Sequence, residues 1–346
     1  MENPQYLNNS NQDAPLVSVI TPVYNGEEFL RECIESVINQ TYQNWHYVIV
    51  NNCSKDRSLE IAQSYAEKDS RIEIIDNEEF LSALGNQNKA IRQIHPQSKY
   101  CKVVHADDWL FPECISKMVD LAEKNPSVGI VGAYIRYGDL VFAEGLPYEI
   151  DVISGREICR SVLKGRSNIF GSPSSILIKS ELIRQNDPFY NEPNLQADIE
   201  VCLKLLQESD FGFVHQMLTY SRKHNRQVTS YMHRVKYFPV AKIKMHHQYG
   251  HIYLNPQENR YYLQQRLEKY HKILGKALFR SQDPEMWDFH RKELKALGYS
   301  ANRMMISVRY VWCVGVELAP KAKRVIYRKL GAIGIINRKK PLVSVQ

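Results

Sequence analysis

The sequence predicts an α/β fold with a mostly parallel central sheet and helices on both faces. In the first part of the chain, short β-rich runs alternate with amphipathic helical segments in units of about 25 to 30 residues. Three of the β-rich runs end in polar residues, at 22–25, 51–52 and 107–108. Parallel strands bring their carboxyl ends to one edge of a sheet, where ligands of such folds bind. We therefore expect the three polar clusters to converge on one cleft.

The elements follow one another regularly from residue 16. Strands are expected where apolar and β-branched residues cluster, at 16–21, 45–50, 72–75, 100–104, 128–134, 176–179 and 211–216. Helices are expected where apolar residues recur at helical spacing, at 27–39, after the capping residue Asp56, at 82–94, at 112–123 and from Asp198 onward. From about Ser230 the pattern is helical only. We therefore predict a leader over residues 1–15 that is disordered, a sheet domain over 16–230, and a helical extension with a basic tail over 231–346.

Composition is that of an ordinary globular protein, with 44% hydrophobic and 24% charged residues in a chain of 346. No run approaches the ~20 apolar residues that span a bilayer, and the start of the chain lacks the pattern of a signal peptide. The seven cysteines are scattered and include no C-x-x-C pair, which argues against a disulfide framework or a zinc site. These features predict a cytoplasmic protein with reduced thiols.

Positive charge is concentrated at the end of the chain. Residues 301–346 contain ten Lys or Arg residues and one acidic residue, Glu317, so 10 − 1 gives this tail a charge of +9, whereas the whole chain has a net charge of +7. This composition is compatible with an amphipathic segment on an anionic membrane surface, because basic amphipathic segments bind anionic lipid. A helix packed on its own domain, with solvated charges, is the alternative interpretation. The tail has no aromatic-rich basic face of a known nucleic-acid module, so no nucleic-acid partner is predicted.

Two adjacent carboxylates, Asp107 and Asp108, follow the apolar run that ends at Val104. Two like charges side by side repel, unless a cation or hydrogen-bond donors share the site. Carboxylate oxygens suit Mg²⁺ or Mn²⁺, and these ions often bridge to phosphates of a substrate. The sequence therefore predicts a metal site here, and a solvated Asp-Asp turn is the alternative.

Several other kinds of site are excluded by missing motifs. No G-x-G-x-x-G follows the first strand and no G-x-x-x-x-G-K-[ST] is present, which removes the Rossmann dinucleotide and P-loop interpretations. H-E-x-x-H and G-x-S-x-G are also absent. The predicted sheet would therefore hold a phosphorylated ligand through a metal and not through a glycine-rich loop.

Four motifs in the expected order resemble those of the family 2 glycosyltransferases of the GT-A fold. They are V-S-V-I-T-P-V-Y-N-G at 17–26, V-I-V-N-N-C-S-K-D at 48–56, N-K-A-I at 88–91 and H-A-D-D at 105–108. The resemblance covers roughly residues 16–230. It implies a GT-A fold and an enzyme that transfers a sugar from a nucleotide-diphosphate sugar, with a UDP-sugar as the expected donor. It also implies a glycan or lipid-linked glycan as acceptor, in polysaccharide assembly. Because such acceptors are often lipid-linked, the resemblance favours peripheral contact of the basic tail with the inner face of a membrane. A nucleotidyltransferase on a similar sheet would need a glycine-rich, Lys-bearing loop after the first strand, which is absent.

The resemblance also implies roles for individual residues. Asp108 is the expected ligand of Mn²⁺ or Mg²⁺, joined by His224 from a segment, Tyr220–His224, that is similar to the family's Y-R-x-H. A solvated charged loop is the alternative for that segment. The expected donor-binding residues are Pro22, Tyr24, Asn25, Glu27, Asn51, Asn88, Asp107 and Arg222.

One position departs from the family pattern. Asn51 and Asn52 stand where the family carries two Asp residues, the first of which accepts from the imide N–H of uracil. An Asn51 amide oxygen can still accept one hydrogen bond, but without the charge. Two alternatives remain at this point: both Asn residues cap a turn, or the chain binds sugar nucleotides but has lost catalysis.

Asp198 is the expected catalytic base. It begins a predicted helix, and a carboxylate at a helix N-terminus is stabilised by the helix dipole and stays ionised. A plain N-cap is the alternative from the spacing alone. The resemblance favours the base, because inverting members of the family carry their base Asp in an equivalent element. Glu200 is the second candidate, although it is expected on a different side of the helix.

Overall fold

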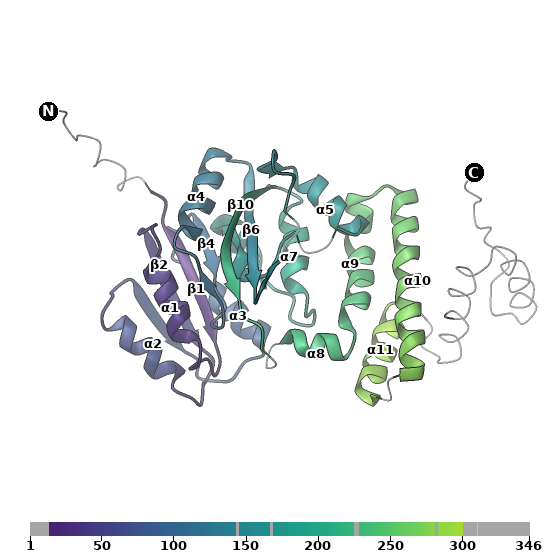
Figure 1. Cartoon of the computed structure of the whole chain (residues 1–346), viewed down its shortest axis with the longest axis horizontal. Helices are drawn as coiled ribbons and strands as arrows, with labels where there is room; N and C mark the ends of the chain where they lie inside the picture. The colour runs from purple at the N-terminus through teal and green to yellow at the C-terminus, as the bar shows by residue number, and fades with distance from the viewer. Residues whose placement is uncertain are drawn as a thin grey trace, which may run out of the picture. The chain divides into compact units, whose positions relative to one another are not determined.

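A computed structural model of the chain describes residues 14–142, 145–166, 169–224, 228–280, 283–299 and 310. The chain forms two compact units, Met1–Asn225 and Arg226–Gln346, which we describe separately (Figure 1). Most of the predicted leader and basic tail lies outside the described residues. The domain boundary expected at residue 230 stays a prediction.

The first unit is organised by one sheet with the strand order β3-β2-β1-β4-β9-β6-β10-β5, with β7 beside β6 and β8 beside β10. The strands are β1 (Val17–Val23), β2 (Trp45–Asn51), β3 (Ile72–Asp76), β4 (Tyr100–Val103), β5 (Trp109–Leu110), β6 (Val128–Tyr137), β7 (Leu140–Phe142), β8 (Val152–Ile153), β9 (Ile176–Lys179) and β10 (Asp210–Ser221). β3, β2, β1 and β4 are parallel to one another, and β6 is parallel to β10. The predicted α/β fold is therefore confirmed.

Helices cover both faces of this sheet. In the first unit they are α1 (Leu30–Ile38), α2 (Ser58–Ala66), α3 (Ala83–Ile91), α4 (Cys114–Lys124), α5 (Gly155–Lys164), α6 (Ser180–Arg184) and α7 (Ala197–Leu205). One face packs Val19 and Ile49 against α1, α2 and α4 in a single hydrophobic core. Successive side chains of a strand point to opposite faces. Ile20 and Val48 therefore point to the other face, where α3 buries Ile91.

The second half of the sheet differs from the expected alternation. β9 runs antiparallel to both of its neighbours, β4 and β6, and β10 continues to Ser221, five residues past its predicted end. Tyr220, expected in a motif after the strand, pairs with Trp109 of β5. The two rings stack with their centroids 5.1 Å apart. Helix α5, which was not predicted, begins where the Ser154 hydroxyl accepts from the N–H of Glu157.

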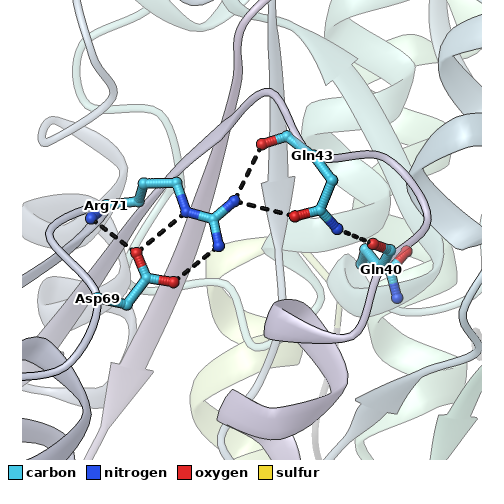
Figure 2. Close-up of polar contacts among 4 residues, drawn as sticks. All are labelled: Gln40, Gln43, Asp69 and Arg71. Carbon is cyan, nitrogen blue, oxygen red and sulfur yellow. Dashed lines mark hydrogen bonds and ion pairs between the residues drawn. The ribbon is translucent and has the colours of Figure 1, made fainter.

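A polar cluster lies at the amino ends of β2 and β3 (Figure 2). Arg71 donates to both carboxylate oxygens of Asp69 and, at 3.1 Å, to the backbone and side-chain oxygens of Gln43. Gln43 in turn donates to the carbonyl of Gln40. The guanidinium also lies 3.6 Å from the ring centroid of Trp45. This cluster is at the opposite end of the strands from the carboxyl edge.

The second unit is helical in its described part. Its helices are α8 (Val228–Arg234), α9 (Tyr237–Tyr253), α10 (Pro256–Arg280) and α11 (Pro284–Ala296). A core of its own joins α9, α10 and α11 and includes Ile243, Leu274 and Trp287. The Tyr270 hydroxyl bonds the buried His290 ring at 2.8 Å within this core. Among the described helices, none combines the length and apolar character that crossing a membrane requires.

Candidate active site

The turns after β1 and β2 are held together by hydrogen bonds between side chains of one turn and N–H groups of the other. Asn25 donates its N–H to the Ser54 hydroxyl at 2.9 Å, and its side-chain oxygen accepts from the N–H of Lys55 at 2.8 Å. Glu27 makes the equivalent pair of bonds with residues 56 and 57, both at 3.0 Å. The side chains of Asn25 and Glu27, expected to bind the donor, therefore shape these two turns.

The two asparagines at the carboxyl end of β2, Asn51 within the strand and Asn52 just after it, have different surroundings. The side-chain amide of Asn52 forms hydrogen bonds through both its oxygen and its nitrogen. The oxygen accepts from the N–H of Leu81 at 2.9 Å and from the Asn77 amide at 3.1 Å, and the nitrogen donates to the Leu81 carbonyl. Asn51 donates to the carboxylate of Asp76 at 2.7 Å. Its oxygen is buried and accepts no hydrogen bond from the described part of the chain. Asn52 thus holds the loop after β3, while Asn51 keeps one acceptor.

Three other predicted donor-binding residues fall into two groups. Pro22 and Tyr24 lie at the end of β1, and the exposed Tyr24 ring meets the exposed Phe80 ring edge to face, with centroids 4.9 Å apart. Asn88 on α3 is engaged elsewhere, because its amide donates to and accepts from the backbone of Tyr190, at 2.9 and 2.7 Å. Asn88 therefore anchors the segment that leads to α7.

The turn that follows β4, His105–Asp108, gathers the charged residues of the site, and we call it the acidic turn. The His224 ring lies 2.9 Å from one carboxylate oxygen of Asp107. The N–H of Arg222 donates to Asp108 at 3.3 Å. Four residues predicted from two distant segments, Asp107, Asp108, Arg222 and His224, are therefore brought together at the ends of β4 and β10.

Asp108 is the buried member of the acidic turn. Burial, and then the neighbouring charge of Asp107, raise the pKa of Asp108 to about 6, against the smaller opposing effects of His105 and of the Ser174 and Ser221 hydroxyls. Two carboxylates placed together with one of them buried are costly to ionise unless a cation is bound. This is the electrostatic arrangement that favours a metal ion.

The backbone of the acidic turn is fixed by Ser174, which is buried in the short 3₁₀ turn Pro173–Ser175 before β9. The Ser174 hydroxyl accepts from the N–H of His105 at 3.0 Å. Its carbonyl accepts from the buried ammonium of Lys102 at 2.6 Å and from the Thr219 hydroxyl at 3.0 Å. Burial lowers the pKa of Lys102. Three strands thus meet at one serine that supports the site.

The Arg222 guanidinium is directed toward α1. It forms an ion pair with Glu32 and lies 4.4 Å from the ring centroid of Phe29. Its Nε also donates to the Asp107 carbonyl at 3.3 Å. The expected diphosphate contact therefore has an acidic partner within the chain, beside the acidic turn.

A divalent cation fits the chemistry of the acidic turn. One ligand atom from each of His105, Asp107 and Asp108 lies within 4.8 Å of the others. Carboxylate oxygens are typical ligands for Mg²⁺ or Mn²⁺, and a cation would also relieve the unfavourable buried charge. An imidazole nitrogen is a suitable ligand for Mn²⁺, which is a transition metal. His224, the predicted second ligand, contacts Asp107 and is not in this group of three.

Asp198 and Glu200 occupy the first turn of α7 but differ in their partners. The buried Glu200 carboxylate accepts from the Asn191 amide at 3.2 Å and from the Asn194 amide at 2.6 Å. No described side chain donates to the half-buried Asp198. Burial raises the pKa of Asp198 to about 6, and its own N–H, the Ile199 N–H and the charge of His105 oppose that rise. His105 therefore lies close enough to influence both Asp108 and Asp198.

Sequence reasoning missed three residues of this site. The sequence predicts His105 only as part of a motif and not as a metal ligand, although it stands two residues before Asp107. Gln87, whose amide nitrogen lies 3.4 Å from Nε2 of His105, and Glu32, the partner of Arg222, gave no local signal. Their contacts join α3 and α1 to the acidic turn and exist only in the folded chain.

Comparison with known proteins shows which family the first half of this chain resembles. Residues 18–185 match the family described as Glycosyl transferase family 2, and this stretch contains the acidic turn and, apart from Val17, the four motifs. This region of the chain is therefore similar to the family 2 glycosyltransferases, as the four motifs indicate.

Two relatives illustrate the range of similarity. An uncharacterised glycosyltransferase of Haemophilus influenzae is 36% identical over 124 residues, 36% of this chain and 38% of the relative. The uncharacterised glycosyltransferase MJ1057 of Methanocaldococcus jannaschii is 27% identical over 228 residues, 65% of this chain and 76% of the relative. The chain thus spans little more than a third of the Haemophilus relative.

Solved structures show the same fold at low identity. Staphylococcus aureus TarS 1–349, in complex with UDP-GlcNAc, superposes with a TM-score of 0.52 at 16% identity, over 92% of this chain and 88% of that one. The mannosyltransferase PcManGT of Pyrobaculum calidifontis, in complex with GDP-Man and Mn²⁺, gives 0.50 at 14% identity, over 88% and 87%.

Proposed function

We propose that this protein is an inverting, metal-dependent glycosyltransferase that moves a sugar from a nucleotide-diphosphate sugar to a hydroxyl of a glycan acceptor. The observation that carries the proposal is that the carboxylates of the site have two different surroundings. Asp107 and Asp108 lie together with His105, which is an arrangement for a cation. Asp198 has no donating side chain among the described residues and a raised pKa, which is an arrangement for a proton.

The acidic turn would hold the diphosphate end of the donor. Asp108, Asp107 and His105 are the residues that would bind Mn²⁺ or Mg²⁺, with His224 orienting Asp107 from 2.9 Å. A divalent cation there would neutralise negative charge on the departing nucleoside diphosphate. Arg222, now paired with Glu32, would add a cationic donor for the same phosphates.

Asp198 would act as the general base. A pKa of about 6 leaves its carboxylate ionised at neutral pH and makes it a stronger proton acceptor than an ordinary Asp. It would take the proton from the acceptor hydroxyl as that oxygen attacks the anomeric carbon. A single in-line displacement inverts the configuration at that carbon.

The donor and acceptor classes are part of the proposal. A UDP-sugar remains the expected donor, with the free oxygen of Asn51 available to accept from a base N–H. The fold neighbours in complex with UDP-GlcNAc and GDP-Man support a nucleotide-sugar. A glycan or lipid-linked glycan is the proposed acceptor, in polysaccharide assembly, with the basic tail contacting the membrane surface where such an acceptor would lie.

A sugar-nucleotide-binding protein without catalysis is the second candidate. The uncharged Asn51 and Asn52 favour it, because the family's pair of carboxylates is missing at that turn. The acidic turn and Asp198 favour the enzyme.

Release of nucleoside diphosphate separates the two candidates. The purified chain is incubated with Mn²⁺ and a panel of nucleotide-sugars, and thermal shift identifies those that bind. The enzyme should release nucleoside diphosphate slowly from a bound donor without acceptor, as water replaces the acceptor hydroxyl. Tight binding with no release above that of an Asp198→Asn variant, with or without glycan acceptors, would favour the binding protein.

A further inference from the structure

We propose that His105 supplies a nitrogen ligand to the divalent cation of the acidic turn and gives the site a preference for Mn²⁺ over Mg²⁺. This inference rests on the proposed function in one respect, namely that the site binds a divalent cation. It goes further by assigning a ligand and a metal preference. The juxtaposition that supports it is a ring nitrogen of His105 within 4.8 Å of the ligand oxygens of both Asp107 and Asp108.

The position of His105 is set by the backbone around it. Its N–H donates to the buried Ser174 hydroxyl at 3.0 Å, and its carbonyl accepts from the N–H of Asp108 at 2.9 Å and from the Cys33 thiol at 3.5 Å. These bonds attach both sides of the residue to neighbouring elements. The ring is therefore presented to the two carboxylates by a backbone with little freedom to move.

With Nδ1 of His105 as the metal ligand, Gln87 would supply the contact that a ligating histidine needs at its other nitrogen. Its side-chain amide lies 3.4 Å from Nε2 of His105. The two ends of such an amide are exchanged by a simple rotation. With its oxygen toward Nε2, Gln87 would accept the Nε2 proton and leave Nδ1 with its lone pair. Metal-binding histidines usually donate their second ring N–H to a nearby acceptor in this way.

A nitrogen ligand changes which ion the site favours. Mg²⁺ is held by oxygen ligands and loses its water reluctantly, whereas imidazole suits the transition metals. Two carboxylates alone would serve Mg²⁺ and Mn²⁺ similarly. Replacement of one oxygen ligand by His105 penalises Mg²⁺ more.

His224 is the natural control, because it is the other histidine beside the carboxylates. It lies 2.9 Å from Asp107 and 5.4 Å, between ring centroids, from Phe29. Its place outside the group of three donor atoms assigns it to the orientation of Asp107. The same substitution at the two histidines should therefore have different effects on the metal.

Pulsed electron paramagnetic resonance of bound Mn²⁺ tests the assignment directly, because modulation from a ligating ¹⁴N reveals a coordinated imidazole. The purified full chain is loaded with Mn²⁺, with and without a nucleoside diphosphate. We expect ¹⁴N modulation in the native protein and in His224→Asn, and its loss in His105→Asn. In His105→Asp, calorimetric titration should show the preference for Mn²⁺ over Mg²⁺ reduced on the order of tenfold, as an oxygen ligand replaces the nitrogen.

The outcomes separate this inference from the proposed function. Bound Mn²⁺ without ¹⁴N modulation, or with modulation that survives in His105→Asn, would overturn the role of His105 and leave the metal site in place. Modulation lost only in His224→Asn would assign the ligand to the other histidine. Failure of the native protein to bind Mn²⁺ at all would remove the metal from the proposed function and this inference with it.

Discussion

The acidic turn and the first turn of α7 both carry an Asp whose pKa burial raises to about 6, yet their surroundings differ. Asp108 has a second carboxylate, an imidazole and the N–H of Arg222 around it. Asp198 has the N–H groups of its own helix turn and no donating side chain in the described chain. We therefore propose that the same side chain, at a similar pKa, binds a cation in the acidic turn and accepts a proton at the start of α7. Substitutions that remove charge without changing size should separate these two roles.

The largest effect is expected at Asp108. Asp108→Asn removes the buried negative charge of the proposed metal site, so transfer should fall by roughly 10³-fold, since a metal contributes several kcal/mol of charge stabilisation in the transition state. Mn²⁺ affinity should fall in parallel, as measured by calorimetry. Asp69→Asn is the matched control, because Asp69 pairs with Arg71 at the opposite edge of the sheet (Figure 2). Normal Mn²⁺ binding by Asp108→Asn would contradict the division of roles.

The next effect is a pH dependence that belongs to Asp198. A base must be deprotonated, so at saturating donor and acceptor kcat should fall about tenfold per pH unit below pH 6, where the raised pKa of Asp198 lies. An Asp with an ordinary pKa near 3.8 would keep its activity down to about pH 4. Metal occupancy should be monitored at each pH, so that loss of Mn²⁺ is not mistaken for protonation of the base. A flat profile between pH 7 and 5 with full metal occupancy would contradict the assignment.

The smallest catalytic effect is expected at Glu200. Glu200→Gln keeps acceptor oxygen for Asn191 and Asn194 but loses the charge, so transfer should change by less than tenfold. The free energy of unfolding should fall by about 1 kcal/mol, since hydrogen bonds to a charged group are worth more than neutral ones. Urea denaturation measures the second quantity. A nearly inactive but stable Glu200→Gln variant would make Glu200 the base.

The sequence predicts the fold and part of the site because those features are local. Apolar runs that end in polar residues place β1, β2 and β4, and adjacent parallel strands then bring Asn51 and Asp108 to one edge. The antiparallel β9 could not be predicted in the same way, because its direction depends on pairing with β4 and β6 and not on its own four residues.

The roles of residues that contact distant parts of the chain could not be predicted from the sequence either. Glu32 and Arg222 are 190 residues apart, and no periodicity connects them. Asn25 and Asn88 lie in the motifs and Glu27 directly follows one, but their side chains hold turns and segments in place. The amides of Asn191 and Asn194, which engage Glu200, precede it in an irregular segment whose path the sequence does not specify. Asp198 and Glu200 were therefore distinguishable by helix position alone.

The most direct test of the two-role account is Asp198→Asn, measured for rate and stability together. Asn cannot accept the proton, so the single-turnover rate should fall 10²–10⁴-fold, while donor and Mn²⁺ affinities stay unchanged. A carboxylate with a raised pKa destabilises the folded state once ionised, so its penalty is present at neutral pH and disappears below about pH 4. Asp198→Asn should therefore raise the free energy of unfolding at pH 7 and lose that gain toward pH 4. A variant that keeps the native rate, or is destabilised at pH 7, would contradict the account and leave Asp198 as an acidic residue of the first turn of α7, whose N-cap is Gln196.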